Sequence, residues 1–184
     1  MTESDDIENA VTAAEQAGQG RRPDPAEPRL LRTALGQFAT GVTLITAREA
    51  DSRAPVGITV NSFASVSLDP ALVLWSAARA SMRHVHFSNA DAFAIHVLKA
   101  DQLDVAERFA RNGNGFEGLD YCLNAAGIPL LDGALARFEC VTEATHEGGD
   151  HTIIIGRVTR FEVAQSGHPL VFAQGRYGSF ADRG

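Results

Sequence analysis

The chain has 184 residues, a formal net charge of -7 and a sequence pI of about 5.3. This length suits one domain with a sizeable core, and the acidic balance argues against a nucleic-acid partner, whose recognition usually needs a basic surface. No apolar run approaches the roughly 20 residues of a membrane-spanning helix, and the acidic N-terminus lacks the basic-then-apolar order of a secretory signal. Cys122 and Cys140 are too few for a disulfide framework, so the expected location is the cytoplasm.

The N-terminal segment differs in composition from the rest of the chain. Residues 1–27 are rich in charged residues, Gln, Gly, Ala and Pro and contain almost no large apolar residues. Such a segment cannot bury enough surface to offset the entropy of ordering, so a disordered acidic tail is predicted there. Residues 28–184 are predicted to form the folded domain. It begins with a short amphipathic helix over 29–39, which Gly41 ends.

Strand patterns dominate the folded domain. The predicted strands are 42–47, 56–68, 71–77, 92–98, 136–146, 151–164 and 170–177. Short helices are predicted over 81–89 and 101–110, the second capped by Asp101, and a Gly-rich loop over 111–120. Many strands at hairpin-like spacing with few helices predict a mainly β fold, a barrel with peripheral short helices.

Polar residues recur within the stretch 56–68, at places where a strand pair could bury both faces. A hydroxyl or amide buried without a partner is costly. The polar face formed by Thr59, Asn61, Ser65 and Ser67 therefore either meets solvent or forms a platform for a flat, polar ligand. The stretch lacks the glycine spacings of a P-loop and of a dinucleotide-binding fingerprint.

Two further clusters are candidate binding elements. Arg79 comes just before Ser81, where a helix is expected to begin, and a helix N-terminus beside an arginine suits a phosphate group. The alternative is a plain serine cap beside a solvated arginine. The sequence EGGDHTIIIGRV (147–158) places Asp150 and His151 at the entrance of an apolar, β-branched run. His151 is either an ordinary polar residue at a strand entrance or a contact for a ligand.

Five fragments together resemble the flavin reductase family with the FMN-binding split-barrel fold. In order, they are LGQFATGVTLIT, GITVNSFASVSLDPALVLWS, FAIHVLKADQ, GGDHTIIIGRV and PLVFAQGRY. The resemblance covers about residues 28–178. It implies a Greek-key-like split β-barrel, a homodimer with flavin beside the dimer interface, and hydride transfer from a nicotinamide nucleotide to the flavin. Members are reductase components of two-component flavin-dependent monooxygenases.

The resemblance also assigns site residues. The flavin-contact stretch falls on Thr59, Val60, Asn61, Ser62, Ser65, Val66 and Ser67, and the phosphate-side stretch falls on Ser76, Arg79 and Ser81. Phe109 is an additional candidate for contact with the flavin, although it could equally face the core of the protein from an amphipathic helix.

On the nucleotide side, the resemblance implies a catalytic role for His151 beside the flavin, with Asp150 orienting it or capping the turn. Arg176 and Tyr177 are expected to bind the nucleotide. Where many relatives carry Asn, this chain has His96, which puts any Asn contact in doubt and is expected to alter the local charge near neutral pH.

The implied function is that of an NAD(P)H:flavin oxidoreductase that reduces FMN or FAD for a separate monooxygenase. One alternative is an FMN-dependent oxidase of the pyridoxamine-phosphate-oxidase type, although the basic residues expected for a second phosphate are scarce. The other is a non-enzymatic flavin-binding protein. The sequence has no arginine cluster for a 2′-phosphate, which favours NADH over NADPH, and it leaves FMN and FAD open.

The sequence does not support a metal site or a cysteine nucleophile. His84 and His86 diverge if they lie on a helix, and no cluster of Cys or Glu accompanies them, so no metal site is expected. Cys140 is expected to be a buried small hydrophobe rather than a nucleophile, and Trp75 to belong to the core.

Overall fold

A computed structural model describes residues 20–181 of the chain. The chain divides into an N-terminal unit that ends at Phe38 and a second unit that begins at Ala39. Most of the tail predicted for residues 1–27 lies outside the described residues, so its disorder and its boundary stay predictions. Within the described residues, no helix is both long and apolar enough to cross a membrane.

The N-terminal unit contains helix α2 (Pro28–Leu35), as predicted. A proline occupies the first turn, where the missing N–H is no loss because that donor has no partner within a helix. The helix stops at Gly36, whose N–H donates to the carbonyl of Arg32 at 2.9 Å. The predicted continuation to residue 39 and the stop at Gly41 are therefore wrong.

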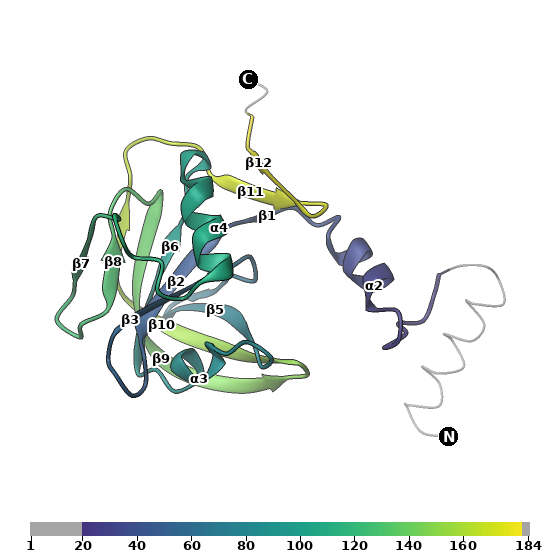
Figure 1. The fold of residues 1–184 in the computed structure, drawn as a ribbon, viewed down its shortest axis with the longest axis horizontal. Helices are drawn as coiled ribbons and strands as arrows, with labels where there is room; N and C mark the ends of the chain where they lie inside the picture. Colours follow the sequence, from purple (N-terminus) through teal and green to yellow (C-terminus); the bar gives the residue numbers. More distant parts are fainter. Residues whose placement is uncertain (1–19, 182–184) are drawn as a thin grey trace. The chain divides into compact units, whose positions relative to one another are not determined.

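The second unit is built mainly from strands (Figure 1). The strands are β1 (Thr40–Gly41), β2 (Thr43–Arg48), β3 (Pro55–Val60), β4 (Ala64–Leu68), β5 (Ala71–Ala78), β6 (Ala92–Val97), β7 (Tyr121–Leu123), β8 (Pro129–Leu131), β9 (Ala136–Gly148), β10 (His151–Val163), β11 (Leu170–Ala173) and β12 (Arg176–Ser179). The helices are α3 (His84–Ser88), the 3-10 turn η1 (Ala100–Gln102) and α4 (Leu103–Arg111).

The main sheet has seven strands in the order β3-β2-β6-β9-β10-β5-β4. Its two edge strands, β3 and β4, are joined by residues 61–63 alone. The edges of a flat sheet of this size would lie about 29 Å apart, whereas the link spans at most about 14 Å. The sheet must therefore curl until its edges meet, which confirms the mainly β fold and agrees with the predicted split barrel.

The structure divides two of the predicted strands. The alternating stretch 56–68 bends at 61–63 and becomes β3 and β4. The stretch 170–177 folds into the hairpin β11–β12, because Gln174 and Gly175 both adopt positive φ, as a two-residue type I′ turn requires. The small sheets β1-β11-β12 and β7-β8 complete the second unit. The short strands β1, β7 and β8 were missing from the sequence prediction.

The predicted cap of the second helix is also wrong. Asp101 lies inside η1, and α4 begins at Leu103. The side chain of Gln102, not that of Asp101, closes this turn by accepting a hydrogen bond from the N–H of Lys99 at 3.0 Å.

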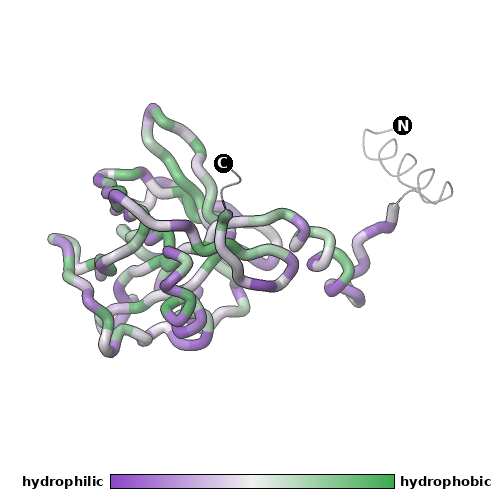
Figure 2. The backbone as a smooth tube through the Cα atoms, turned by 90° about the horizontal axis from the view of Figure 1, so that it is seen from above, coloured by the Kyte–Doolittle hydropathy of each residue, from purple (hydrophilic) through white to green (hydrophobic). Residues whose placement is uncertain are grey.

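Two larger apolar clusters and one small cluster around Ile128 and Leu130 form the core of the described residues. The first lies inside the curled sheet around Trp75, Phe93 and Ile154, and the second lies between the sheet and α4 around Leu44 and Phe109. Strand β2 contributes to both clusters and is buried along residues 43–47. Hydrophobic and hydrophilic stretches are interspersed along the strand-rich unit (Figure 2), and burial alternates along β5, as expected of a strand with one buried face.

Candidate functional site

Three of the predicted site stretches meet where β5 ends and β10 begins. The Oγ of Ser62 accepts a hydrogen bond from the N–H of Ser76 at 3.0 Å and donates to its carbonyl at 3.3 Å. The N–H of Arg79 donates to the carbonyl of Asp150 at 2.9 Å, and His151 pairs with Ala78 across the strands. The structure thus joins the predicted flavin, phosphate and nucleotide stretches through direct contacts.

The hairpin between β9 and β10 presents His151 at this junction. Its two-residue turn consists of Gly149 and Asp150, and Gly149 has the positive φ of 67° that the first position of a type II′ turn requires. The Nδ1 of His151 lies 2.7 Å from Oδ1 of Asp150. This contact leaves Nε2 for another partner, and the orienting role expected of Asp150 stays a prediction. The His151 side chain is 41% exposed, so a ligand can reach it.

Arg79 is held beside the same turn. Its Nη2 lies 3.0 Å from Oε1 of Glu147, whose side chain is 90% exposed. An exposed ion pair of this kind contributes little to stability and breaks readily. The guanidinium keeps further N–H groups for an anion. Nothing in the sequence singled out Glu147, because its role depends on the pairing of β9 with β10.

The hydroxyl groups of the predicted flavin stretch are not equally available. Thr59 donates its O–H to the carbonyl of Ala106 at 2.7 Å, and Ser62 donates its O–H to the carbonyl of Ser76. Ser67 accepts from the N–H of Asp69 at 3.2 Å, which leaves its own O–H free to donate. The side chains available to a ligand in this stretch are therefore Ser67 together with the exposed Asn61 and Ser65.

Strand β4 adds backbone donors to this set. It is an edge of the main sheet and pairs only with β5, so alternate N–H and C=O groups point away from the sheet. The register shifts between Ser65 and Ser67, which places Val66, 48% exposed, in a bulge. Val60, at the end of β3, is half-buried against the first core cluster. Hydroxyl, amide and backbone donors beside an arginine suit the polar edge and the phosphate of a flavin.

The outer face of the sheet beside the junction is largely apolar. Burial alternates along β5 and β10, so every second residue faces away from the core. These outward residues pair as His151 with Ala78, Ile153 with Ser76 and Ile155 with Leu74. Directly opposed residues share a face of the sheet, so His151 stands at the end of an apolar row.

The structure corrects the expected place of Ser81. Helix α3 begins at His84, and its N-cap is Arg83, so Ser81 lies in the preceding turn. There its Oγ accepts from the N–H of Arg83 at 3.2 Å and keeps its own O–H as a donor. A phosphate contact from Ser81 would therefore rest on this hydroxyl rather than on a helix N-terminus.

Phe109 was a candidate for contact with the flavin, and the structure places it in the core instead. Its side chain is 0% exposed and packs edge-on against Phe116, with ring centroids 4.8 Å apart. Trp75 is core as predicted, with 0% exposure and Phe87 and Phe93 at its edges.

His96 is neutral rather than a source of charge near neutral pH, which corrects the expectation from the sequence. Complete burial lowers its pKa from 6.5 to about 4. Its Nε2 accepts from the N–H of Leu131 at 3.0 Å, so Nδ1 carries the proton and faces the carbonyl of Leu44 at 3.1 Å. The ring thus joins β2 to β8 inside the protein and cannot contact a ligand at the surface.

Arg176 and Tyr177 lie on a different strand from the junction residues. Both belong to β12, where Tyr177 packs against Phe172 with ring centroids 5.2 Å apart and Arg176 is exposed. The ring contact of Tyr177 lies within the β11–β12 hairpin and does not involve the turn at Asp150 and His151. Their role in nucleotide binding stays a prediction.

Other candidate groups are occupied elsewhere. His84 Nε2 lies 2.9 Å from Oγ1 of Thr152, whereas His86 Nδ1 accepts from the N–H of Ala50 at 3.2 Å. Among the described residues, no group of three or more His, Cys, Asp or Glu is placed to hold a metal ion. Burial raises the pKa of the Cys140 thiol to about 12, which confirms it as an inert core residue.

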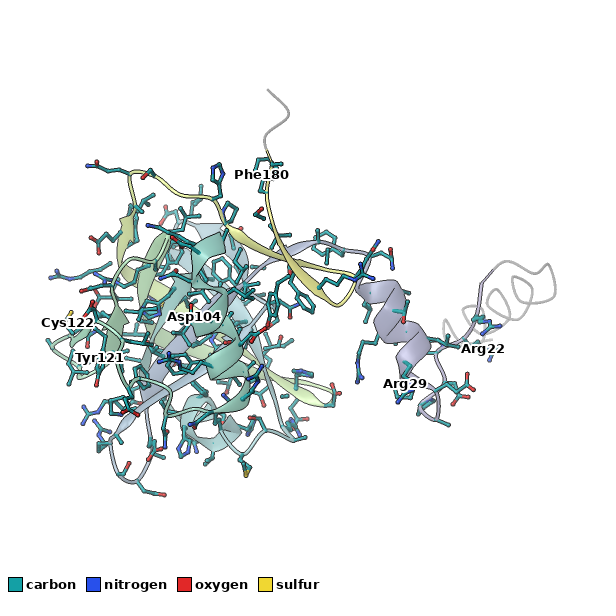
Figure 3. The ribbon with its side chains drawn as sticks, turned by 45° about the horizontal axis from the view of Figure 1, so that its top comes forward. Arg22, Arg29, Asp104, Tyr121, Cys122 and Phe180 are labelled. Carbon is teal, nitrogen blue, oxygen red and sulfur yellow. The ribbon has the colours of Figure 1, made fainter. Side chains whose placement is uncertain are left out.

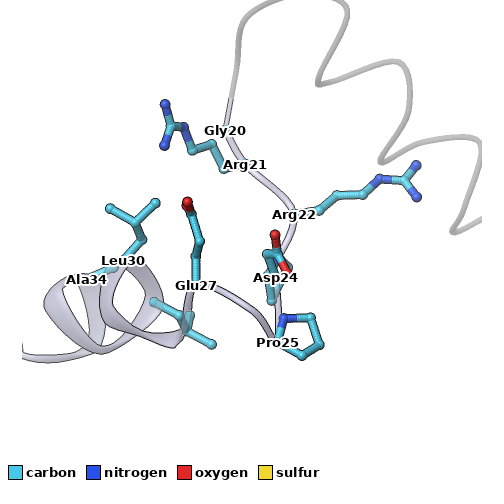
Figure 4. A pocket seen from close by; sticks show the side chains of 10 residues that line it. Gly20, Arg21, Arg22, Asp24, Pro25, Glu27, Leu30 and Ala34 are labelled. Atoms are coloured by element: carbon cyan, nitrogen blue, oxygen red, sulfur yellow. The ribbon is translucent and has the colours of Figure 1, made fainter.

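A hollow of about 800 Å³ in the N-terminal unit contains none of the predicted site residues. Residues 20–34 line it, including Arg21, Glu27 and Leu30 (Figure 4). It lies between an extended segment and α2, and no buried polar side chain faces it. The candidate site is therefore the β5–β10 junction in the second unit.

Comparisons with known proteins identify the family of the chain. Residues 35–181 match the family model of the flavin reductase like domain. The chain is 53% identical over 159 residues to SmoA of Agrobacterium fabrum, an FMN reductase (NADH), which covers 86% of this chain and 90% of SmoA. It is 45% identical over 137 residues to the reductase component of a flavin-dependent trigonelline monooxygenase from Acinetobacter baylyi, covering 74% of this chain and 44% of that relative.

A solved structure gives the same fold. The NADH:FAD oxidoreductase SgcE6 of Streptomyces globisporus, in complex with NAD and FAD fragments, superposes with a TM-score of 0.80 at 36% identity. The match covers 89% of this chain and 99% of SgcE6. Because the family model spans residues 35–181 and the relatives share this much sequence, the chain belongs to the flavin reductase family.

Proposed function

We propose that this chain is an NADH-dependent flavin reductase that supplies reduced flavin to a separate flavin-dependent monooxygenase. The observation that carries the proposal is the meeting of Ser62, Ser76, Arg79 and His151 at one junction. Membership of the flavin reductase family and the similarity to a reductase component of a monooxygenase support it.

The residues at the junction divide the work of binding. The exposed Asn61 and Ser65 and the edge of β4 would hold the polar edge of the flavin, and Arg79 and the hydroxyl of Ser81 would hold its phosphate. When bound, the flavin accepts a hydride from the nicotinamide nucleotide, which is the redox chemistry of the reaction. The protein's contribution is to position the two ligands and keep water from them.

His151 would bind the nicotinamide nucleotide. Asp150 fixes its ring through Nδ1, so Nε2 is directed to the ligand and not to the protein. Arg176 and Tyr177 are proposed to add contacts from β12.

The choice of ligands follows the relatives' names. SmoA is named an FMN reductase that uses NADH, and SgcE6 an NADH:FAD oxidoreductase. Both names include NADH, which agrees with the lack of an arginine cluster for a 2′-phosphate. The higher identity to SmoA favours FMN as the flavin.

We also propose that two copies of the chain form a homodimer. The apolar row on the outer face of β5 and β10 and the exposed Val66 and Leu68 of β4 need cover from water. A second copy at this face would enclose the flavin as well, because the β4 edge borders the junction.

The cysteines support a cytoplasmic location for this enzyme. Cys122 lies beside Tyr121 on the exposed strand β7 (Figure 3), Cys140 is buried, and both are free thiols. Free thiols of this kind suit a reducing compartment.

A steady-state assay tests the function. NADH and NADPH are each combined with FMN, FAD and riboflavin, and oxidation of the nucleotide is followed by absorbance. Flavin-dependent oxidation of NADH, undiminished by excess EDTA, is the expected result. Flavin binding without NADH oxidation would instead support a flavin carrier, and oxidation of an amine phosphate would support the oxidase alternative.

A further inference from the structure

Arg83 follows the loop Arg79–Ser81, the phosphate-side loop, and links it to β3 and to α4. Its Nη1 donates to the carbonyl of Phe109 at 2.6 Å and to that of Gly57 at 3.2 Å, and its Nη2 donates to the carbonyl of Ala110 at 3.2 Å. The stem of Arg83 packs so closely on Gly113 that a Cβ at that glycine would lie 2.8 Å from Cδ. One half-buried side chain thus joins α3, β3 and the end of α4.

The acceptors explain why an arginine stands at this position. Phe109 and Ala110 lie in the last turn of α4, where carbonyl groups have no partner within the helix and the helix dipole favours a cation. The planar guanidinium reaches three carbonyls at once, whereas a lysine ammonium reaches fewer in a fixed geometry. Burial lowers the pKa of Arg83, but a guanidinium group in a protein stays protonated at neutral pH.

Helix α4 holds both the flavin-contact stretch and the phosphate-side loop. Thr59, in the flavin-contact stretch, donates to the carbonyl of Ala106 in α4. Arg83 is two residues beyond Ser81, and its own N–H donates to Oγ of Ser81. Helix α4 therefore fixes the flavin-contact strand through Thr59 and the phosphate-side loop through Arg83.

We propose that Arg83 is a positioning residue for flavin binding, which holds the loop Arg79–Ser81 at the distance from β3 that the flavin requires. It acts through the loop, because its guanidinium is directed at backbone carbonyls of β3 and α4. The inference rests on the proposed function, since the loop matters only if it binds the flavin.

The chain offers a matched control in Arg108. This arginine also donates from Nη1 to loop carbonyls, those of Glu117 at 2.7 Å and Gly115 at 3.4 Å. It anchors the loop that follows α4, and neither of these two bonds involves the loop Arg79–Ser81. Arg108→Met therefore removes the same kind of bonds without releasing Ser81.

The experiment compares Arg83→Met, Arg83→Lys and Arg108→Met with the wild type. Flavin affinity is measured by quenching of FMN fluorescence, KM values and kcat by NADH oxidation, and stability by thermal unfolding. Arg83→Met is expected to raise the Kd for FMN about 10-fold or more, which corresponds to about 1.4 kcal/mol. Arg83→Lys is expected to recover part of this loss, and Arg108→Met to change the Kd less than about 2-fold. The KM for NADH and kcat at saturating FMN should stay near wild type in every variant.

The outcomes separate this inference from the proposed function. If wild-type protein neither quenches FMN fluorescence nor oxidises NADH, the proposed function fails and the inference fails with it. If the wild type does both but Arg83→Met and Arg108→Met shift the Kd equally, or neither shifts it, Arg83 has only a structural role. If Arg83→Met does not fold, Arg83→Lys decides: a wild-type Kd overturns the inference, and a raised Kd with unchanged KM for NADH supports it.

Discussion

His151 stands at the tip of the β9–β10 hairpin, with its ring fixed by Asp150 and its side chain 41% exposed. His151→Ala is expected to lower kcat/KM for NADH about 5- to 150-fold, because one hydrogen bond of roughly 1 to 3 kcal/mol is lost. The Kd for flavin should change much less. Nucleotide kinetics at saturating flavin and fluorescence quenching measure the two effects separately.

The paired control removes Arg79 and Ser81. The double variant Arg79→Ala, Ser81→Ala should weaken flavin binding first and leave the KM for NADH closer to wild type. If His151→Ala loses flavin affinity but keeps its nucleotide kinetics, His151 binds the flavin rather than the nucleotide. If it changes neither, His151 is an ordinary polar residue at a strand entrance.

His96 makes stability depend on pH in a predictable direction. Its folded pKa of about 4 lies below the unfolded value of 6.5, so in this window the unfolded chain binds a proton that the folded chain does not. Stability is therefore lost as the pH falls from about 6.5 towards 4, by about 2 kcal/mol between pH 7 and pH 5. Urea unfolding at both pH values measures it. His96→Asn should reduce this loss, and an unchanged pH dependence in that variant would show that His96 is not responsible.

At the scale of elements, β10 joins the site to the core. His151 begins the strand, and Gly156 lies in its middle, where a Cβ would stand 2.5 Å from Cζ of Phe93 and 3.0 Å from Cβ of Cys140. Gly156→Ala is expected to destabilise the fold by about 1 to 3 kcal/mol through overpacking. Thermal unfolding tests it against Gly178→Ala, where nothing lies within 4 Å of the added Cβ. Equal melting temperatures for the two variants would contradict the tight packing of β10 on β6.

At the scale of the whole molecule, the strand-rich unit is expected to carry the activity. The chain separates into compact units at Phe38, and all the predicted site residues lie beyond that point. Deleting residues 1–25 should therefore leave NADH oxidation and the proposed homodimer largely intact. Sedimentation at micromolar concentration measures the oligomeric state of both proteins. A fully active monomer would overturn the homodimer, and loss of activity on deletion would give the N-terminal segment a function.

Most strands, the two longer helices and the stretches of the candidate site follow from local features of the sequence. These features depend on local periodicity and on fragments such as GGDH, which can be identified without the tertiary structure. Which groups in those stretches are available to a ligand depends on tertiary contacts. Thr59 and Phe109 look suitable for a ligand. However, the hydroxyl of Thr59 donates to a carbonyl of α4, and the ring of Phe109 is buried in the core. Burial and hydrogen-bond partners are set by residues distant in sequence, and for the same reason the neutrality of His96 and the anchoring by Arg83 could not be predicted from local pattern.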